Sequence, residues 1–305
     1  MRILVTGVKG QLGHDLAPEL TRRNHAVIGT DLAPNDSGAS AYIPLDITDR
    51  DAVQKVIREI KPDAVVHCAA WTNVDAAEAE ENRARAEAVN HWGTKYIAAA
   101  AKAADAKLLY LSTDYVFSGE GETPWKPDET HDAPLNVYGQ TKLAGEIAVR
   151  NALDRFFIVR TAWMFGANGR NFVKTMLRLG GTQGSVRVVN DQIGTPTYTK
   201  DLARLLSDMI ETDRYGCYHA TNAGGYISWY DFTKEIYRQA GLAAAVVPIS
   251  TAEYGLSKAR RPLNARLDQS KLREAGFVPL PLWQDALERY LKETGLENGS
   301  NFSDL

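Results

Sequence analysis

Short apolar runs alternate with longer amphipathic segments through the first half of the chain. The runs occupy residues 3–5, 26–28, 42–45, 64–66, 108–111 and 156–159. The segments between them have helical character, reaching residue 23 after the first run and then covering residues 51–60, 80–104 and 137–151. Short strands separated by helices indicate repeated βαβ units and a parallel sheet. Because such crossovers are almost always right-handed, the pattern predicts an α/β fold with a doubly wound Rossmann sheet.

The alternation weakens after about residue 161, where Gly, Pro and aromatic residues become more frequent and helices are predicted at 199–211, 228–239 and 282–294. We expect a dinucleotide-binding domain in residues 1–165 and a smaller, mainly substrate-binding portion in residues 166–297. A segment near 215–221 could return to the main sheet, and the polar tail at 298–305 is expected to fray. Pro18 lies inside the first helix, which we expect it to kink or interrupt.

The composition restricts the class of protein. Of the 305 residues, 44% are apolar and 24% are charged, as in ordinary globular proteins. The 35 Lys and Arg residues nearly balance the 38 Asp and Glu residues, so the sequence predicts neither a nucleic-acid partner nor a membrane surface as partner. The sequence predicts no signal peptide and no membrane-spanning segment, and two cysteines make no disulfide framework. We therefore expect a cytoplasmic protein.

Three glycines follow the first strand and open the first helix: Gly7, Gly10 and Gly13. Glycines there let backbone N–H groups and the helix N-terminus approach a pyrophosphate, although the GxxGxxG spacing departs from GxGxxG and a simple turn would also explain it. Asp31 ends the second strand, where a carboxylate would bind ribose hydroxyls and repel a 2′-phosphate. Asp46 ends the third strand and could reach an adenine. If the two aspartates bind a dinucleotide, they predict NADH or NADPH as cofactor, and Asp31 favours NADH. The alternative is that both aspartates only cap loops.

A tyrosine and a lysine lie at positions i and i+4 of the predicted helix at 137–151: Tyr138 and Lys142. One ammonium about 4 Å away supplies roughly 4 kcal/mol at an effective dielectric near 20, enough to lower the pKa of a phenol from about 10 to about 7. Tyr138 could then protonate a carbonyl oxygen while a hydride reaches the carbon. The same spacing also occurs by chance in many helices.

Ser112, Thr113 and Asp114 stand at the end of the fifth predicted strand. Ligands of such sheets bind beyond the carboxyl ends of the strands, so a hydroxyl there can hold a substrate oxygen against Tyr138. The alternative is that these side chains cap a turn.

Taken together, these motifs resemble the extended short-chain dehydrogenase/reductases. Within that superfamily, several segments are similar to the dTDP-4-dehydrorhamnose reductase family, namely residues 67–75, 112–117 and 191–197, and residues 160–163 together with 171–172. The similarity extends from residue 1 to about residue 290. It implies the NAD(P)H-dependent reduction of the 4-keto group of dTDP-4-dehydro-L-rhamnose to dTDP-L-rhamnose, for cell-surface polysaccharide.

The resemblance also implies a role for each matching residue. The catalytic set would be Thr113, Tyr138 and Lys142, and Tyr138 and Lys142 would also touch the cofactor. The other residues along the dinucleotide would be Gly7, Gly10, Gln11, Leu12, Gly13, Asp31, Asp46, Ile47, Ala69, Ala70 and Trp71. The sugar nucleotide would meet Val74, Thr113, Asp114, Tyr138 and Trp163. Trp71 and Trp163 could equally be core aromatics, and Arg260 and Arg261 could meet a diphosphate or be solvated.

Alternatives to this function remain open. Dehydratases of the superfamily carry an acidic residue after Thr-Asp, whereas this chain has Tyr115, which favours simple reduction. The same chemistry could act on another nucleotide-linked 4-ketosugar. A rival from another class is a non-catalytic, cofactor-binding regulatory subunit, because the β subunit of methionine adenosyltransferase resembles the same family. Intact Thr113, Tyr138 and Lys142 favour an enzyme.

Assembly is a point of departure from the family pattern. Some members pair through carboxylates gathered around Mg²⁺, a cation that requires oxygen ligands. One contributing position is Lys200 in this chain, while Asp15 retains a carboxylate at another. We therefore expect a metal-independent monomer. The six histidines show no HExxH spacing, so no catalytic zinc is predicted either.

Overall fold

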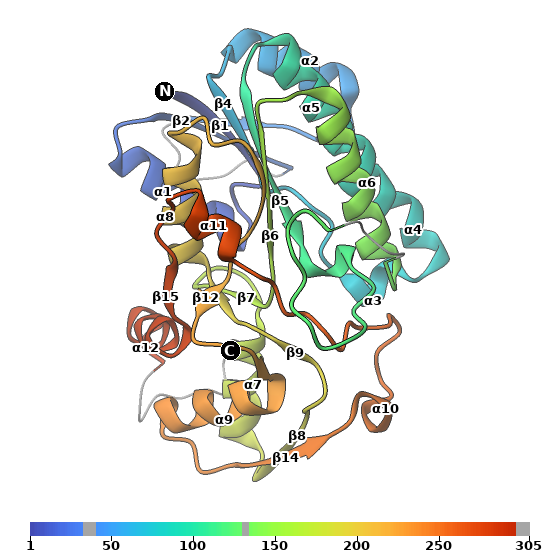
Figure 1. The fold of residues 1–305 in the computed structure, drawn as a ribbon, viewed down its shortest axis with the longest axis vertical. Coiled ribbons are helices and arrows are strands. Elements are labelled where there is room, and N and C mark those ends of the chain that lie inside the picture. Colours follow the sequence, from blue (N-terminus) through green and yellow to red (C-terminus); the bar gives the residue numbers. More distant parts are fainter. Residues whose placement is uncertain (33–40, 130–133, 297–305) are drawn as a thin grey trace.

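The computed structural model describes residues 1–32, 41–129 and 134–296. Within these residues a seven-stranded parallel sheet, in the order β11-β6-β5-β4-β1-β2-β3, lies between two layers of helices (Figure 1). Its strands are β1 (Arg2–Thr6), β2 (Ala26–Asp31), β3 (Ala41–Pro44), β4 (Ala64–His67), β5 (Lys107–Thr113), β6 (Phe156–Thr161) and β11 (Gly216–His219). The predicted Rossmann sheet is confirmed. The tail at 298–305 lies outside the described residues.

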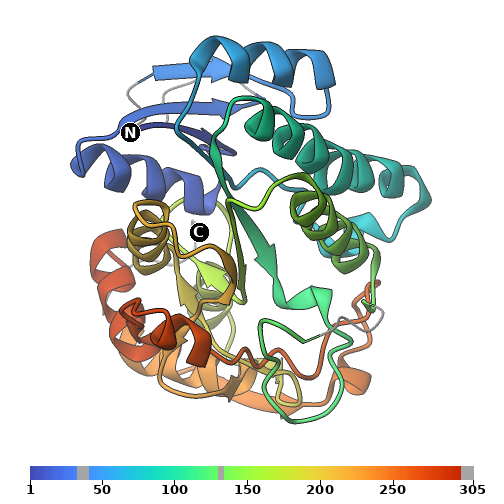
Figure 2. The ribbon, with the colours of Figure 1, turned by 45° about the horizontal axis from the view of Figure 1, so that its top comes forward.

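The two faces of the sheet are covered by different helices, as the alternation of side chains along a strand requires. Ile3 and Val5 of β1 belong to the core of one face, and Leu4 belongs to the core of the other. On the first face lie α1 (Gln11–Arg22) and α8 (Thr199–Ile210), and on the second lie α2 (Arg50–Ile60), α5 (Thr94–Ala103) and α6 (Val137–Ala152) (Figure 2). The strand β11 therefore extends this sheet and α8 packs on it, although both follow residue 165, where we expected the dinucleotide-binding domain to end.

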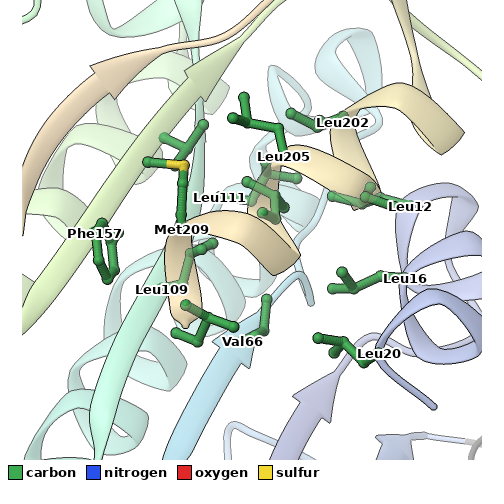
Figure 3. Close-up of a cluster of buried hydrophobic side chains, with 14 of the residues drawn as sticks. Leu12, Leu16, Leu20, Val66, Leu109, Leu111, Phe157, Leu202, Leu205 and Met209 are labelled. Atoms are coloured by element: carbon green, nitrogen blue, oxygen red, sulfur yellow. The ribbon is translucent and has the colours of Figure 1, made fainter. Parts of the chain in front are cut away.

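Figure 3 shows the core of the first face, where leucines of α1 meet α8 above the sheet. Pro18 lies inside α1, yet α1 continues from Gln11 to Arg22, so the expectation of an interrupted helix is wrong. The missing N–H of a proline removes one hydrogen bond of the helix. Leu16 and Leu20, on either side of Pro18, are fully buried, and this burial holds the helix together across that position.

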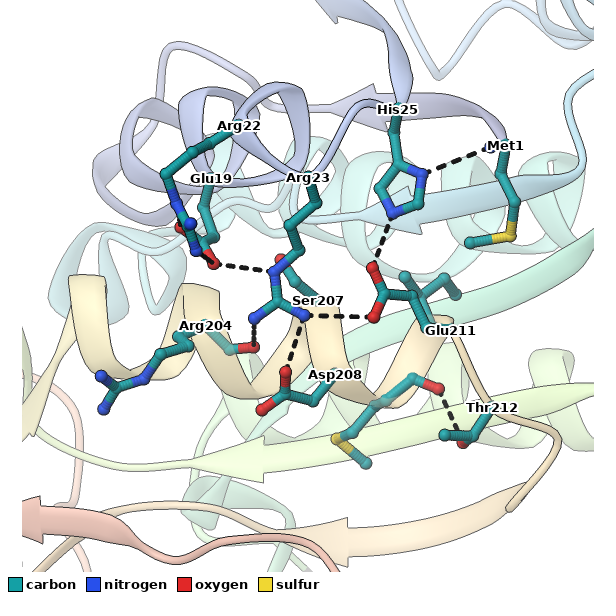
Figure 4. Close-up of polar contacts among 12 residues, drawn as sticks. Met1, Glu19, Arg22, Arg23, His25, Arg204, Ser207, Asp208, Glu211 and Thr212 are labelled. Carbon is teal, nitrogen blue, oxygen red and sulfur yellow. Dashed lines mark hydrogen bonds and ion pairs between the residues drawn. The ribbon is translucent and has the colours of Figure 1, made fainter.

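Charged side chains join α1 to α8 at the edge of this layer (Figure 4). The guanidinium of Arg23 lies 2.8 Å from Glu19, 2.7 Å from Asp208 and 3.2 Å from Glu211. Glu211 also lies 2.8 Å from the ring of His25. Because α1 opens at the glycine loop, these contacts and the leucine core together fix the direction from which that helix approaches the loop.

The segment predicted as a helix over residues 80–104 is three segments in the structure. The regular helices α4 (Glu80–Glu87) and α5 are joined by a π-helical stretch, η1 (Ala88–Gly93). In η1 the side chain of Asn90 is fully buried, and Gly93 packs so closely on Ile47 that a Cβ atom would lie 2.9 Å from its side chain. Such widened turns are frequent at functional sites, and this one faces the site described below.

The remaining elements pack around a separate hydrophobic core beyond the carboxyl ends of the strands. The predicted helices near residues 228–239 and 282–294 are confirmed as α9 (Trp229–Ala240) and α12 (Trp283–Thr294). The sequence did not predict α7 (Phe172–Thr182) or the parallel pair of β8 (Ser185–Val189) and β14 (Ala245–Ile249).

Shorter elements complete this portion of the chain. They are α3 (Val74–Ala77), η2 (Asp114–Val116), α10 (Thr251–Tyr254) and α11 (Ser270–Glu274), and the strand pairs β7 (Met164–Phe165) with β10 (Thr197–Tyr198), β9 (Ile193–Gly194) with β13 (Ile227–Ser228), and β12 (Asn222–Ala223) with β15 (Leu280–Leu282). Among the described helices, none combines the length and the apolar character needed to cross a bilayer.

Candidate active site

A cavity of about 840 Å³ opens beyond the carboxyl ends of β1, β2, β4 and β5. This is the edge at which parallel sheets of this kind bind ligands. Apart from Arg260, the residues that the sequence singled out for a site line this cavity: Gly7, Gly10, Gln11, Leu12, Gly13, Asp31, Asp46, Ile47, Ala69, Ala70, Trp71, Val74, Thr113, Asp114, Tyr138, Lys142, Trp163 and Arg261. It thus brings together residues that are far apart in the sequence.

The glycine loop brings backbone close to the cavity. Gly7 has a φ of +68°, and a Cβ there would lie 2.6 Å from the backbone N of Ala69. A Cβ on Gly13 would lie 2.3 Å from the carbonyl oxygen of Gly7, so α1 can start against β1 only with glycine at that position. Gly10 precedes the first turn of α1 and offers no side-chain cap to it. The open N–H groups of this turn fit the pyrophosphate of a dinucleotide.

Asp31 and Asp46 line the same cavity from the ends of the next two strands. The carboxylate of Asp31 accepts hydrogen bonds from the backbone N–H groups of Lys9 (3.0 Å) and Leu32 (2.8 Å), which fix its direction. Asp46 accepts from both the N–H and the hydroxyl of Thr48, at 2.9 and 2.7 Å. Asp46 therefore closes a turn, as the alternative interpretation expected, while also facing the cavity.

Asn90 connects the cofactor side of the cavity to α6, and the sequence reasoning missed it. Its side chain accepts from the N–H of Trp71 (2.8 Å) and donates to the carbonyl of Trp71 (3.1 Å) and to the hydroxyl of Thr141 (3.0 Å). These bonds hold residue 71, which lines the cavity, against the helix that carries Tyr138 and Lys142. Nothing in the periodicity of the sequence marks Asn90, because its role depends on the π-helical turn.

The three residues expected to be catalytic come together at the start of α6 and the end of β5. Asn136 caps α6 by accepting from the N–H of Gly139 at 2.8 Å. A Cβ on Gly139 would lie 2.1 Å from the carbonyl oxygen of Tyr115, so glycine allows the helix to press against the end of β5. This contact brings Tyr138 next to Thr113, whose hydroxyl favours the ionised form of the phenol.

The electrostatics differ from the expectation at Tyr138. Burial raises the pKa of its phenol, which outweighs the lowering effect of the hydrogen bond with Thr113, so the expected lowering toward 7 is wrong in this structure. The ammonium of Lys142 donates to the carbonyl of Leu111 at 2.7 Å and lies 4.1 Å from the ring centre of Tyr110. Burial lowers the pKa of Lys142 to about 7.

Asp114 is a buried acid that also faces the cavity. Its Oδ1 accepts from the hydroxyl of Thr113 at 3.0 Å, while its Oδ2 is buried with no hydrogen-bond partner among the described residues. Burial raises the pKa of this carboxyl to about 7. A buried oxygen without a partner is costly, so this atom fits a hydroxyl group of a ligand.

Tyr115, in the position where dehydratases carry an acid, is held by a positive side chain. Its hydroxyl accepts from Arg261 at 3.0 Å, and Arg261 is paired in turn with Asp75 at 2.6 Å. Tyr115 and Arg261 both line the cavity, whereas Arg260 does not belong to the lining. The end of the cavity beyond Asp114 is therefore polar and carries one guanidinium.

Aromatic side chains close this end of the cavity. Trp163 has a φ of +51°, an uncommon backbone conformation for a tryptophan, and its ring stacks on Trp229 with centroids 3.6 Å apart. Phe172 lies 4.3 Å from Trp229, and all three rings line the cavity. Sequence reasoning missed Trp229, because its distance along the chain from Trp163 gives no sign that the two rings meet.

The residues considered for a metal-bridged dimer are engaged within the chain. Lys200 lies 2.5 Å from the carboxylate of Glu293, and Asp15 accepts from the hydroxyl of Thr199 at 2.5 Å. In the part of the chain that the structure describes, no group of three or more His, Cys, Asp or Glu side chains is placed to hold a metal ion.

Comparisons with known proteins agree with this geometry. The chain is 45% identical to the dTDP-4-dehydrorhamnose reductase of Streptomyces griseus, over 94% of this chain and 91% of that protein. It is 38% identical to the dTDP-4-keto-6-deoxy-D-glucose reductase of Streptomyces niveus, over 94% and 95% of the two chains. A solved structure of the Bacillus anthracis dTDP-4-dehydrorhamnose reductase in complex with NADP superposes with a TM-score of 0.88, at 41% identity, covering 96% of this chain and 99% of that one.

These relatives are reductases, and the similarity covers nearly the whole length of each chain. The family model described as the RmlD substrate binding domain matches residues 1–296. The chain is therefore an NAD(P)H-dependent oxidoreductase and belongs to the RmlD substrate binding domain family.

Proposed function

We propose that this chain reduces the 4-keto group of dTDP-4-dehydro-L-rhamnose to a hydroxyl group, giving dTDP-L-rhamnose, with NADH or NADPH as the reductant. The observation that carries the proposal is one cavity lined by the glycine loop, by Tyr138 and Lys142, and by Thr113. The identity of 45% to a relative named for this reaction supports the choice of substrate.

The chain's own residues would supply the proton and orient the ketone. A nicotinamide cofactor, when bound, would supply the hydride for C4 of the sugar. Tyr138 would donate its phenolic proton to the ketone oxygen, so that the carbonyl gains a hydride and a proton and becomes an alcohol. Thr113 would donate a hydrogen bond to the same oxygen, and Lys142 would hold the nicotinamide ribose and stabilise the phenolate that forms.

The rest of the cavity would hold the two ligands in place. Asp31 would bind the hydroxyls of the adenosine ribose, which supports a preference for NADH over NADPH. The Oδ2 of Asp114, which has no hydrogen-bond partner among the described residues, would bind a sugar hydroxyl, and Trp163 and Val74 would pack on the deoxysugar and its nucleotide. Arg261 would face the diphosphate of the sugar nucleotide.

We further infer a metal-independent monomer in the cytoplasm. Lys200 places a cation where some relatives gather carboxylates, and its ion pair with Glu293 lies within one chain. Activity that survives EDTA, together with a monomeric mass in sedimentation, is the expected result. Loss of activity in EDTA that Mg²⁺ restores would contradict this inference.

The function is tested by following the absorbance of NADH and NADPH at 340 nm with enzymatically prepared dTDP-4-dehydrorhamnose. We expect oxidation of the cofactor and formation of dTDP-L-rhamnose by the purified chain alone. Cofactor binding without turnover of any 4-ketosugar would favour the regulatory subunit instead.

A reductase of another nucleotide-linked 4-ketosugar is the second candidate. The observation that favours it is the 38% identity to a relative named for dTDP-4-keto-6-deoxy-D-glucose. Ranking kcat/KM for both ketosugars in the same assay decides between the two.

A further inference from the structure

Directly behind the site, α6 carries a second charged residue one turn after Lys142. Glu146 is fully buried, and so is Arg160 of β6, which donates to both carboxylate oxygens of Glu146 at 2.8 and 2.7 Å. Ser112 of β5 donates to the same carboxylate at 2.6 Å. A bidentate ion pair with a third donor is therefore enclosed between α6 and the sheet.

Such a pair is costly to bury, and its presence alone is weak evidence for stability. Arg160 also donates to the carbonyl of Pro127 (3.1 Å) and contacts the ring of His219 (3.2 Å). The pair is thus well satisfied, and the carboxylate is held rigidly in one place.

The carboxylate of Glu146 and the ammonium of Lys142 are anchored to consecutive residues of β5. Lys142 donates to the carbonyl of Leu111 at 2.7 Å, and Glu146 accepts from the hydroxyl of Ser112. Residues four apart on a helix share one face, so both side chains of α6 point at the end of β5. Ser112 is followed at once by Thr113, which meets the phenol of Tyr138.

Glu146 opposes the effect of burial on Lys142. Burial lowers the pKa of Lys142 to about 7, and the carboxylate of Glu146 is the largest influence in the other direction, ahead of the Cys68 thiol. The other titratable groups nearest this pair are neutral around pH 7, because burial lowers the pKa of His67 and His219 and raises that of Cys68, Tyr110, Tyr138 and Cys217. The charged groups around them are Arg160, Arg150, which lies 3.8 Å from Glu146, and Asp128, whose carboxylate acts on Arg160.

We propose that Glu146 is a positioning residue for the reduction: held by Arg160 and Ser112 on the face of α6 that also carries Tyr138 and Lys142, its carboxylate keeps the ammonium of Lys142 charged. This inference rests on the proposed function, because it assigns Lys142 its role there. Arg160 has two opposite effects, since it fixes Glu146 in place but also repels Lys142.

The test is the pH dependence of kcat in two variants whose effects have opposite signs. Activity requires a charged Lys142, so it falls as pH rises through the pKa of that residue. Glu146→Gln leaves the positive charge of Arg160 unopposed. The basic limb of the pH profile, which is the fall of kcat at alkaline pH, should then move by about one pH unit toward acid. At a fixed pH on that limb, kcat should be about ten-fold lower than in the wild type. Arg160→Met removes the positive charge that repels Lys142, while Ser112 still donates to the carboxylate of Glu146, and should move the limb toward alkali.

The matched control is Glu288→Gln on α12, which breaks an exposed ion pair 2.6 Å long with Lys292. It should leave the basic limb at the wild-type pH. The proposal is overturned if the basic limb stays in place in either Glu146→Gln or Arg160→Met, or if it moves toward acid in both variants. The buried pair would then have a structural role only. Because the expected pH shift has a different direction in each variant, a single variant that folds is enough to decide whether the proposal holds.

A second readout separates this inference from the proposed function. NADH binding is followed by the fluorescence of the cofactor over the same pH range, because Lys142 binds more strongly when charged. The midpoint of the loss of affinity should move with the same signs in the two variants. Wild-type protein that binds NADH but reduces no ketosugar would sink the function, whereas unmoved binding midpoints would sink only the role of Glu146.

Discussion

The two ends of the cavity are built in different ways. The cofactor end consists of strand ends and backbone from residues 7–32 and 45–71, with the glycine loop and the start of α1 at its centre. The opposite end consists of side chains from distant segments, among them Tyr115, Trp163, Trp229 and Arg261. A surface made of backbone recognises what all dinucleotides share, and a surface made of side chains can change its substrate while the sheet stays the same.

The middle of the cavity, where the two ends meet, is where charge is buried. Lys142 and Asp114 each have a pKa of about 7 there, and both shifts are caused mainly by loss of contact with water. Proton transfer at neutral pH requires groups of this kind. Substitutions at the middle should therefore change turnover, whereas those at either end should change the binding of one ligand.

The largest effect is expected at the middle, from Tyr138→Phe. Loss of the phenolic proton should lower kcat by roughly 10²- to 10⁴-fold, the usual worth of a general acid. The affinity for NADH should stay close to that of the wild type, because the ring remains in place. Steady-state turnover at 340 nm and NADH fluorescence measure the two quantities.

Tyr254→Phe is the control for this variant, because Tyr254 lies exposed on α10 and does not line the cavity. It should turn over at the wild-type rate. Wild-type kcat in Tyr138→Phe would mean that another group supplies the proton.

A smaller effect, confined to the substrate end, is expected from Trp229→Ala. Removing this ring takes away the stacking partner of Trp163 and part of the cavity wall, which we expect to cost about 1.4 kcal/mol of substrate binding, a ten-fold rise in KM for the sugar nucleotide. NADH affinity should not change. Trp92→Ala, which removes an exposed ring stacked on His91, serves as the control. Equal losses of affinity for both ligands would erase the distinction between the two ends.

The smallest effect is expected at the cofactor end, from Asp31→Ala. Without this carboxylate the ratio of kcat/KM for NADH to that for NADPH should fall about five-fold, the worth of roughly 1 kcal/mol of hydrogen bonding to a ribose hydroxyl. Turnover at saturating cofactor should stay near that of the wild type. An unchanged ratio would remove Asp31 from cofactor selection.

The sequence-based predictions succeeded at the cofactor end of the cavity more often than at the substrate end. The strands of the sheet, the glycine loop and the acid at the end of β2 were recognisable because each depends on a few neighbouring residues. Two expectations were wrong for reasons of packing: buried leucines hold α1 together across Pro18, and burial raises the pKa of Tyr138. The π-helical turn with Asn90 and the ring of Trp229 gave no local signal at all.

The sequence by itself determined the alternation of strands and helices, and hence a sheet whose carboxyl ends gather the residues of a nicotinamide site. Hydrophobic periodicity and glycine geometry could determine this because both act over a few residues. Only the tertiary structure decided that Glu146 and Arg160 form a buried pair behind Lys142, and that Trp163 meets Trp229. Those contacts depend on the register of neighbouring strands and on how closely α6 approaches β5. The strength of a buried charge depends on everything that surrounds it, and short-range patterns in the sequence carry no record of that.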